Sequence, residues 1–164
     1  MNRIVFALLL ACVLSSAHAV ARAPEDAIKA VNAYSQALMA ADCPAVVRMS
    51  GVLSRHPEAT ESLCSTYAEW KQRGLVERLR APTAFLASAQ DRLVVVPNSR
   101  IAMTGGRPMI NNGVYIVYSN DAGRSWKIID IGCDHLADWV KGVYPAYDGR
   151  PTFSATVDRP TATR

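Results

Sequence analysis

The segment from Gly113 to Gly132 constrains the fold more than any other part of the chain, because it has the form of a β-hairpin. Two runs rich in β-branched and aromatic residues, Val114 to Tyr118 and Trp126 to Ile131, flank a short polar stretch that contains a glycine. This pattern is typical of two antiparallel strands joined by a turn. The sequence therefore predicts a hairpin in the C-terminal half of the chain.

The turn of this hairpin matches the Asp-box pattern Ser-x-Asp-x-Gly-x-Ser-Trp, which is carried by Ser119, Asp121, Gly123, Ser125 and Trp126. Asp121 is predicted to accept hydrogen bonds from backbone N–H groups of the turn, and Gly123 to adopt a positive φ. Trp126 is then expected to bury its ring beneath the turn. The pattern stabilises a hairpin but carries no chemistry, and a single copy does not make a propeller.

The first 19 residues have the features of an export signal. Met1 to Arg3 is positively charged, Ile4 to Leu14 is apolar, and Ala17-His18-Ala19 is a small-x-small cleavage pattern. The apolar run is shorter than the roughly 20 residues of a membrane span. We expect cleavage after Ala19, no stable membrane span, and a periplasmic or secreted protein. In a second interpretation, a lipobox ends at Cys12 and leaves that cysteine acylated.

The remaining chain has the length of one domain, predicted over residues 20–156, with a flexible tail over residues 157–164. The signal holds one charged side chain, Arg3, so cleavage leaves 17 basic against 14 acidic side chains and a net charge of +3. The densest basic run, Lys71 to Arg80, is interrupted by apolar residues and a glutamate. We interpret it as an amphipathic segment with a solvated face and predict no nucleic-acid partner.

Three cysteines remain after the expected cleavage: Cys43, Cys64 and Cys133. In an oxidising compartment two of them are expected to pair, and the sequence allows three pairings. A Cys43–Cys64 bond is favoured because both cysteines fall in the helical half and would join consecutive elements. Closing that loop contributes about 3 kcal/mol in the chain-entropy description. Cys133 would then be a buried free thiol.

The first half of the chain has the apolar spacing of helices. A first helix begins near Pro24, and Asp42 is expected to cap a short second helix that ends near Met49. A third helix is predicted over Glu58 to Arg73, with Gly74 ending it. The apolar stripe of the first helix consists of Ala27, Ile28, Val31, Tyr34, Leu38 and Met39, and that of the third of Leu63, Tyr67 and Trp70.

From Pro82 onward the pattern is that of strands. The strands expected before the hairpin are Thr83 to Ala89, Arg92 to Val96, and Arg100 to Thr104. Pro97 to Ser99 is expected to interrupt the last two, and turns are predicted at Gly105-Gly106 and at Asn111-Asn112-Gly113. After the hairpin, Asp134 is expected to cap a short helix that runs through Lys141.

Three N-terminal helices followed by a curved antiparallel β-sheet of four or more strands predict an α+β fold, with the helices packed on one face. The helix sequence AIKAVNAYSQALMAADCPAVV, which contains Asp42, and the strand sequence SWKIIDI resemble those of the nuclear-transport-factor-2-like (cystatin-like cone) superfamily. The resemblance covers roughly residues 24–133. Folds of this type host isomerases, dehydratases, hydrolases, binding proteins and inert partner modules, so the resemblance does not select a function.

Asp130 is the main candidate for chemistry, because a carboxylate lies within the apolar strand Ile128 to Ile131. If both sheet faces are covered, Asp130 either lines a pocket with a raised pKa or pairs with a basic or hydroxyl group. A structural role is favoured over a catalytic one. Four aromatic side chains are candidates for a ligand site, although core packing is the more common role of such residues: Tyr34, Tyr67, Trp70 and Tyr115.

Other residues carry weaker signals. Cys133-Asp134-His135 is adjacent in sequence, and neighbouring residues rarely converge on one metal ion, so a helix cap with a surface histidine is favoured. His56 lies beside a proline and is expected in a loop. The sequence contains no GxSxG nucleophile elbow, and Gly105 to Pro108 lacks the lysine of a phosphate loop. We therefore expect no metal and no cofactor.

The expected function is that of a non-catalytic exported module that binds a small apolar ligand or a protein partner. One alternative is a small cone-fold enzyme with Asp130 as general base, although the sequence lacks a clear Asp-His pair at the positions that the resemblance implies. Another is a secreted inhibitor or immunity-type protein that acts through an exposed loop at Pro97 to Gly113. A cavity with Asp130 at its floor would favour the enzyme, and a filled core with a protruding loop would favour the inhibitor.

Overall fold

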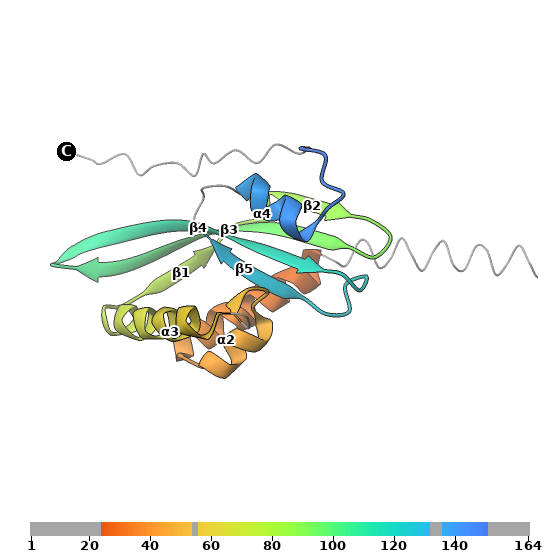
Figure 1. Cartoon of the computed structure of the whole chain (residues 1–164). Coiled ribbons are helices and arrows are strands. Elements are labelled where there is room, and N and C mark those ends of the chain that lie inside the picture. The colour runs from red at the N-terminus through yellow and green to blue at the C-terminus, as the bar shows by residue number, and fades with distance from the viewer. Residues whose placement is uncertain (1–23, 54–55, 132–135, 151–164) are drawn as a thin grey trace, which may run out of the picture.

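A computed structural model of the chain describes residues 24–53, 56–131 and 136–150. In this part of the chain most helices precede the strands, and the strands form one curved antiparallel sheet (Figure 1). The predicted α+β class is therefore confirmed. The expected export signal, the tail over residues 157–164 and the segment Cys133-Asp134-His135 lie outside the described residues.

The described helices cover residues 24–40, α2 (Cys43–Met49), α3 (Pro57–Gln72) and α4 (Leu136–Val143). Asp42 caps α2 as predicted, because its Oδ1 accepts a hydrogen bond from the Ala45 N–H at 3.1 Å. Gly74 follows α3 with φ of +72°, a conformation that favours glycine. The first three helices lie on one side of the sheet and α4 lies on the other (Figure 1).

A disulfide joins Cys43 to Cys64, with the two Cα atoms 6.1 Å apart. It links the start of α2 to the middle of α3 across a sequence separation of 21 residues. The favoured pairing is thus confirmed, and its physical basis is that both cysteines belong to consecutive helices of one layer.

The sheet consists of β1 (Val76–Leu79), β2 (Ala84–Ala87), β3 (Arg92–Thr104), β4 (Arg107–Ser119) and β5 (Lys127–Ile131). Its strand order is β1-β3-β4-β5, and β2 pairs with the same edge of β3 as β1 does. Every pairing between these strands is antiparallel. The long strands β3 and β4 therefore form the centre of the sheet, and the predicted β4–β5 hairpin is its outer part.

The predicted interruption at Pro97 to Ser99 is wrong, because β3 runs through these residues without a break. The Pro97 carbonyl accepts a hydrogen bond from the Arg80 N–H at 2.9 Å. The N and C=O of one strand residue face the same edge, so the proline nitrogen faces the gap between β1 and β2. A missing N–H donor is tolerated at that position because the neighbouring strand is itself interrupted there.

The turn predicted at Asn111-Asn112-Gly113 is also wrong, because these residues lie inside β4. The β3–β4 turn is instead Gly105-Gly106, the other predicted turn, with φ of +57° and +75°. Gly113 lies opposite the buried Asn98, and a Cβ at residue 113 would be 2.9 Å from the Asn98 Oδ1. The glycine therefore leaves room for a buried amide.

The run Lys71 to Arg80 has the solvated face that we predicted, because its basic side chains are exposed and burial alternates along β1 (Val76–Leu79). It contains the end of α3, the Gly74 turn and the unpredicted strand β1, and the Glu77 side chain is only 3% exposed. The pattern did not reveal that part of this segment is a strand, or that the strand carries a buried carboxylate.

Residues 97–113 do not form the exposed loop that we expected. They are the outer parts of β3 and β4, which form a two-stranded arm that extends beyond the helices (Figure 1). Among the described residues, four of the five exposed large hydrophobic side chains lie on this arm or on β1 beside it: Val76, Met103, Met109 and Ile110.

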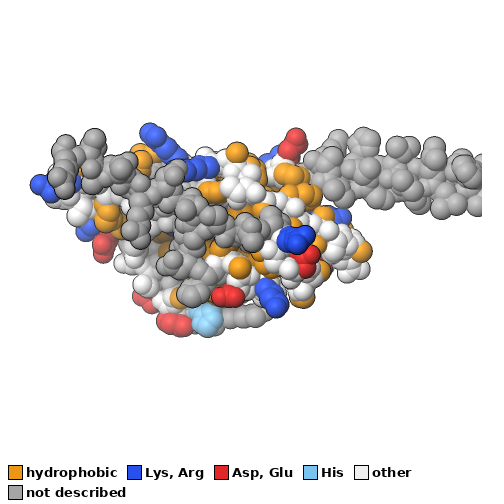
Figure 2. Space-filling model, turned by 90° about the horizontal axis from the view of Figure 1, so that it is seen from above, with side chains coloured by type: hydrophobic (Ala, Val, Ile, Leu, Met, Phe, Trp, Pro, Cys, Tyr) orange, Lys and Arg blue, Asp and Glu red, His pale blue; other side chains and the backbone are white. Residues whose placement is uncertain are grey.

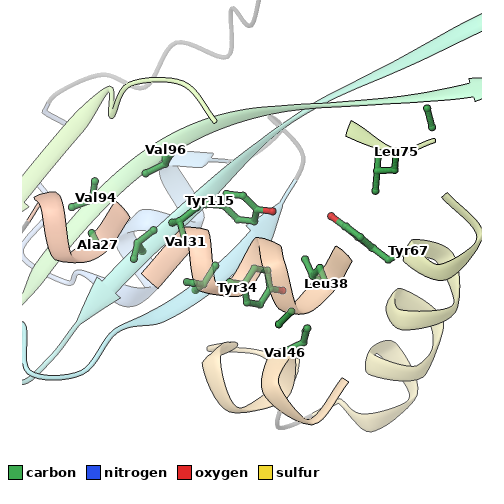
Figure 3. Close-up of a cluster of buried hydrophobic side chains, with 14 residues drawn as sticks. Ala27, Val31, Tyr34, Leu38, Val46, Tyr67, Leu75, Val94, Val96 and Tyr115 are labelled. Carbon is green, nitrogen blue, oxygen red and sulfur yellow. The ribbon is translucent and has the colours of Figure 1, made fainter. Parts of the chain in front are cut away.

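Both faces of the sheet are covered where β3, β4 and β5 meet. On the side of the first three helices, Tyr34 of the helix at residues 24–40 packs in one core with Val94 and Tyr115 of the sheet, which Figure 3 shows together with their neighbours. The opposite face packs against α4 through Leu136 and Val140. Figure 2 looks onto the α4 side, where hydrophobic side chains are interspersed with both basic and acidic ones.

The Asp-box turn has the predicted geometry. Asp121 accepts hydrogen bonds from the Ser125 N–H at 2.9 Å and from the Ser125 and Ser119 hydroxyls, each at 2.6 Å. Gly123 has φ of +88°. Trp126 packs against the helix-side core beneath the turn, as predicted, with its indole nitrogen buried and the residue as a whole partly buried.

The outer edge of β5 is partly paired. Ser50 forms an isolated parallel bridge with Ile128, and the Gly51 N–H donates to the Ile128 carbonyl at 2.8 Å.

No helix in the described part of the chain is long and apolar enough to cross a membrane.

Candidate functional site

A buried polar cluster lies on the helix-side face of the sheet and contains Glu77, Arg100, Tyr115, Asp130 and Tyr67. We call it the Arg100 cluster. Its charged side chains are almost fully enclosed, with Arg100 10%, Glu77 3% and Asp130 9% exposed. Charged groups at this depth require partners, and the strands provide them.

Arg100 bridges the two carboxylates. Its Nε donates to Glu77 Oε1 at 2.8 Å, and one terminal nitrogen donates to Asp130 Oδ2 at 2.7 Å. The same terminal nitrogen donates to the Tyr115 hydroxyl at 2.7 Å. One guanidinium is thus shared between two carboxylates, in charge-assisted hydrogen bonds.

Tyrosine hydroxyls complete the cluster. The Tyr115 hydroxyl donates to Glu77 Oε1 at 2.7 Å, and the Tyr67 hydroxyl reaches Asp130 Oδ2 at 3.5 Å, a long hydrogen bond. The Arg100 guanidinium also lies over both rings, 5.2 Å from the Tyr67 centroid and 5.3 Å from the Tyr115 centroid. Figure 3 shows the two hydroxyls pointing toward one another, from α3 and from the sheet.

Strand register places these residues on one face. Glu77 of β1 is the direct partner of Arg100 of β3, and Tyr115 of β4 is the direct partner of Asp130 of β5. Direct cross-strand partners point to the same side of a sheet, so two neighbouring pairs converge beneath the helices. The Ser35 hydroxyl, from the first helix, donates to Glu77 Oε2.

For Asp130 and for Arg100, burial and the charge of the partner shift the pKa in opposite directions. Burial raises the pKa of Asp130, and the neighbouring Arg100 charge opposes that rise. Burial disfavours the Arg100 cation, yet Asp130, the two tyrosines and Glu77 together outweigh it and raise the pKa of Arg100. Burial, assisted by the Asp130 charge, raises the pKa of Tyr67 and Tyr115, which therefore stay neutral.

A cavity of about 140 Å³ adjoins the cluster at Asp130. Its walls are mostly apolar and aromatic, and its polar side chains are those of Ser50, Tyr34 and Asp130. The lining residues are Tyr34, Ser50, Val52, Leu53, Leu63, Ile129, Asp130, Ile131 and Trp139. A wider groove of about 540 Å³ beside α4 shares Val52, Ile129 and Trp139 with the cavity.

The backbone of Asp130 also faces this edge of the sheet. The Ile128 carbonyl bonds outward to the Gly51 N–H, and alternate residues of a strand face the same edge. The N–H and C=O of Asp130 therefore point outward, beyond the Ser50 bridge. Both the Arg100 and Tyr67 bonds use Oδ2, and no described donor reaches Oδ1.

The candidates from the sequence have different outcomes. Asp130, Tyr67 and Tyr115 belong to the cluster, and Tyr34 lines the cavity and packs edge-on against Tyr115 at 5.7 Å. Trp70 stacks on Tyr67 at 6.0 Å but lines no part of this cavity. His56 lies at the surface, 3.5 Å from Glu58.

Arg100, Glu77 and Ser35 were not among the residues predicted from the sequence. A signal existed for Arg100, because it lies in alternation with Val94 and Val96 on one face of its strand. An arginine on the inward face of a strand requires an acid on a neighbouring strand. Glu77 was hidden because β1 itself was not predicted.

Among residues 24–53, 56–131 and 136–150, no group of three or more His, Cys, Asp or Glu side chains is arranged to hold a metal ion. Comparisons of the chain with models of protein families, with curated proteins and with solved structures found no match. The function therefore has to follow from the geometry of this site.

Proposed function

We propose that this protein is a binding module that takes one small, compact ligand into the cavity beside Asp130. The observation that supports the proposal is that Asp130 lines an otherwise mainly apolar cavity while its described hydrogen bonds use Oδ2 alone, which leaves Oδ1 without a described donor. Ligand sites in proteins typically combine apolar walls with a few polar groups that fix the orientation of the ligand.

The size of the cavity limits the ligand. A volume of 140 Å³ is close to that of an engineered cavity of about 150 Å³ that holds benzene. The cavity therefore suits a body of six or seven carbon atoms. A longer molecule would extend into the groove beside α4, which shares Trp139 with the cavity.

Ligand binding explains this site better than general-base catalysis does. This holds although a cavity beside Asp130 is the feature that we expected of an enzyme. Asp130 Oδ2 is engaged by Arg100 and Tyr67, which hold the carboxylate in one orientation. Among the described lining residues, Tyr34 is the only other titratable side chain, and burial raises its pKa. A catalytic base also needs a second group that stabilises or protonates the substrate, and in the described cavity only the uncharged hydroxyls of Tyr34 and Ser50 could serve.

The expected location outside the cytoplasm stays part of this proposal. The Cys43–Cys64 disulfide supports it, because structural disulfides persist in oxidising compartments. The export signal and its cleavage after Ala19 stay predictions, which the intact mass of the mature protein would test.

The proposal is tested with benzyl alcohol and toluene as neutral probes on the full chain, by two-dimensional NMR. We expect saturable shifts at cavity residues such as Ile129 and Leu63. Filling the cavity with Leu63→Phe should abolish them, whereas the matched control Val76→Phe, at an exposed position, should not. Shifts that persist in Leu63→Phe, or that never saturate, would refute a cavity site.

A second candidate function is the binding of an acidic protein partner by the arm. Val76, Ile101 and Ile110 form one row across β1, β3 and β4, and Val76 and Ile110 are 50% and 43% exposed. Two exposed arginines, Arg78 and Arg80, lie beside this row. Glu77 is the only acid in β1, β3 and β4, and it is buried, so the surface complements an acidic, partly apolar partner.

This candidate is tested by placing a photo-crosslinker at Met103 in the producing cell. A discrete adduct that disappears in Ile110→Asp, but persists in the control Glu69→Lys on α3, would support a partner on the arm. Identification of the adduct as a basic protein, or an adduct unaffected by Ile110→Asp, would contradict it.

A further inference from the structure

We infer that the ligand of the cavity is a small organic cation, with a primary ammonium group at Asp130 and an apolar body of six or seven carbons. This inference rests on the proposed function and adds the chemical class of the ligand. The evidence for it is that the Arg100 cluster contains more negative than positive charge.

The cluster contains two carboxylates and one guanidinium. Glu77 and Asp130 each form an ion pair with Arg100, at 2.8 and 2.7 Å, and no other described cation pairs with either of them. Arg100 is therefore divided between two acids and neutralises only one formal charge. A net negative charge at this depth is costly, and the surroundings must compensate it.

Two species can supply the missing positive charge. One is a proton on Asp130, in keeping with the burial that raises the pKa of this carboxyl. The other is a cation that enters the cavity and contacts Oδ1, which is the acceptor that Arg100 and Tyr67 leave available. When Asp130 is ionised, a cation at Oδ1 would complete the cluster.

The cavity walls suit such a cation. Tyr34 and Trp139 line it, and the electron-rich faces of aromatic rings attract an ammonium group in an apolar setting. The outward carbonyl of Asp130 offers a second acceptor for an ammonium donor. An anionic ligand is excluded, because the charged group closest to the cavity is itself a carboxylate.

A change at Glu77 separates the effect of the charge of the Arg100 cluster from the effect of direct contact with the ligand. Its carboxylate belongs to the cluster but does not line the cavity. Glu77→Gln therefore removes the excess negative charge while the cavity walls stay unchanged. The Arg100 ion pair with Asp130 remains in this variant.

The test compares benzylamine, as its ammonium ion, with benzyl alcohol, which has nearly the same shape and no charge. We expect calorimetric titration of the full chain at pH 7 to show benzylammonium binding about tenfold more tightly. Glu77→Gln should reduce this preference to about twofold or less, and the exposed control Glu69→Gln should retain it. Circular dichroism melts establish that each variant is folded.

The pH dependence gives a second measurement. The titratable groups that face Asp130 are Glu77, Arg100 and the tyrosines of the cluster and cavity, and the pKa of each of those tyrosines is raised. Asp130 is thus the group expected to control binding below pH 7. Affinity for benzylammonium should fall as acidification protonates Asp130, whereas affinity for benzyl alcohol should change little.

Benzyl alcohol that binds as tightly as benzylammonium at pH 7, or more tightly, would overturn the inference that the ligand is a cation. The proposed binding function would remain intact. A preference that survives in Glu77→Gln would overturn the role of the excess charge. Failure of benzyl alcohol, toluene and benzylammonium alike to bind would remove the proposed function as well.

Discussion

Asp121 lies in the turn before β5 and Asp130 lies within that strand, yet the two aspartates occupy opposite environments. Asp121 lies in the β4–β5 turn, where hydrogen bonds from Ser119 and Ser125 hold its pKa well below the usual range. Asp130 lies under the helices, where burial raises its pKa. Both side chains are held by hydrogen bonds, so the difference comes from access to water and from the balance of neighbouring charge.

The comparison separates local from tertiary control of a carboxylate. Every donor to Asp121 comes from within four residues in the chain. The donors to Asp130 come from Arg100 and Tyr67, which are 30 and 63 residues away. Hydrogen bonds within a turn can therefore stabilise an ionised carboxylate without the rest of the fold. The charge state of Asp130, in contrast, depends on groups from three strands and a helix.

The largest effect is expected from Arg100→Met, which removes the cation shared by Glu77 and Asp130. Two buried carboxylates would then lack a charged partner, and losing one member of a buried pair costs about 3–5 kcal/mol. Denaturant unfolding should show this loss. Arg107→Met, at an exposed position near the β3–β4 turn, should change the free energy of unfolding by less than about 0.5 kcal/mol. Equal effects would mean that the cluster is not a structural centre.

Trp126→Ala tests the turn side of the comparison. Trp126 packs against the helix-side core and is partly buried, so we expect a loss of about 2–4 kcal/mol, at or below the range for fully buried aromatic residues. Trp139→Ala, which truncates a tryptophan that is 39% exposed, should cost clearly less. A Trp126 variant as stable as the parent would show that the β4–β5 hairpin is peripheral.

Local features were predictable because their physical causes lie within a few residues. The Asp-box turn, the Asp42 cap and the Gly74 helix end each depend on one side chain or one backbone conformation, and each was confirmed. The Cys43–Cys64 bond was also predictable, since it joins consecutive helices.

Features that depend on register between distant strands were not predictable. Pro97 and Gly113 resemble a break and a turn in the sequence, but the fold places them opposite a strand gap and a buried Asn98. The Arg100 cluster was missed for the same reason, because Glu77 and Arg100 become partners only when β1 pairs with β3. Asp130 was recognised because a carboxylate stands out in an apolar strand. Its partner Arg100 was not recognised.

Asp130→Asn is expected to have a smaller effect at pH 7, a loss of about 1 kcal/mol or less, because the amide keeps the shape and avoids burial of a charge. Its pH dependence is more informative. Because the pKa of Asp130 is raised on folding, protonation favours the folded state, and this group adds stability as the pH falls toward and below the ordinary value of 3.8. The parent should therefore gain stability relative to Asp130→Asn on acidification. A gain on raising the pH instead would mean that Arg100 dominates the carboxyl.

Asp121→Asn should have the smallest effect and the opposite sign of pH dependence. The pKa of Asp121 is lowered on folding, so its contribution is fully present above the ordinary aspartate value and is lost as the pH falls through the folded pKa. The parent should lose stability relative to Asp121→Asn on acidification, because the amide keeps one acceptor for the Ser125 N–H at every pH. Denaturant melts of both variants between pH 7 and pH 3 provide the measurement. If the stability difference between parent and variant changed with pH in the same direction for both variants, the proposed contrast between the two environments would be contradicted.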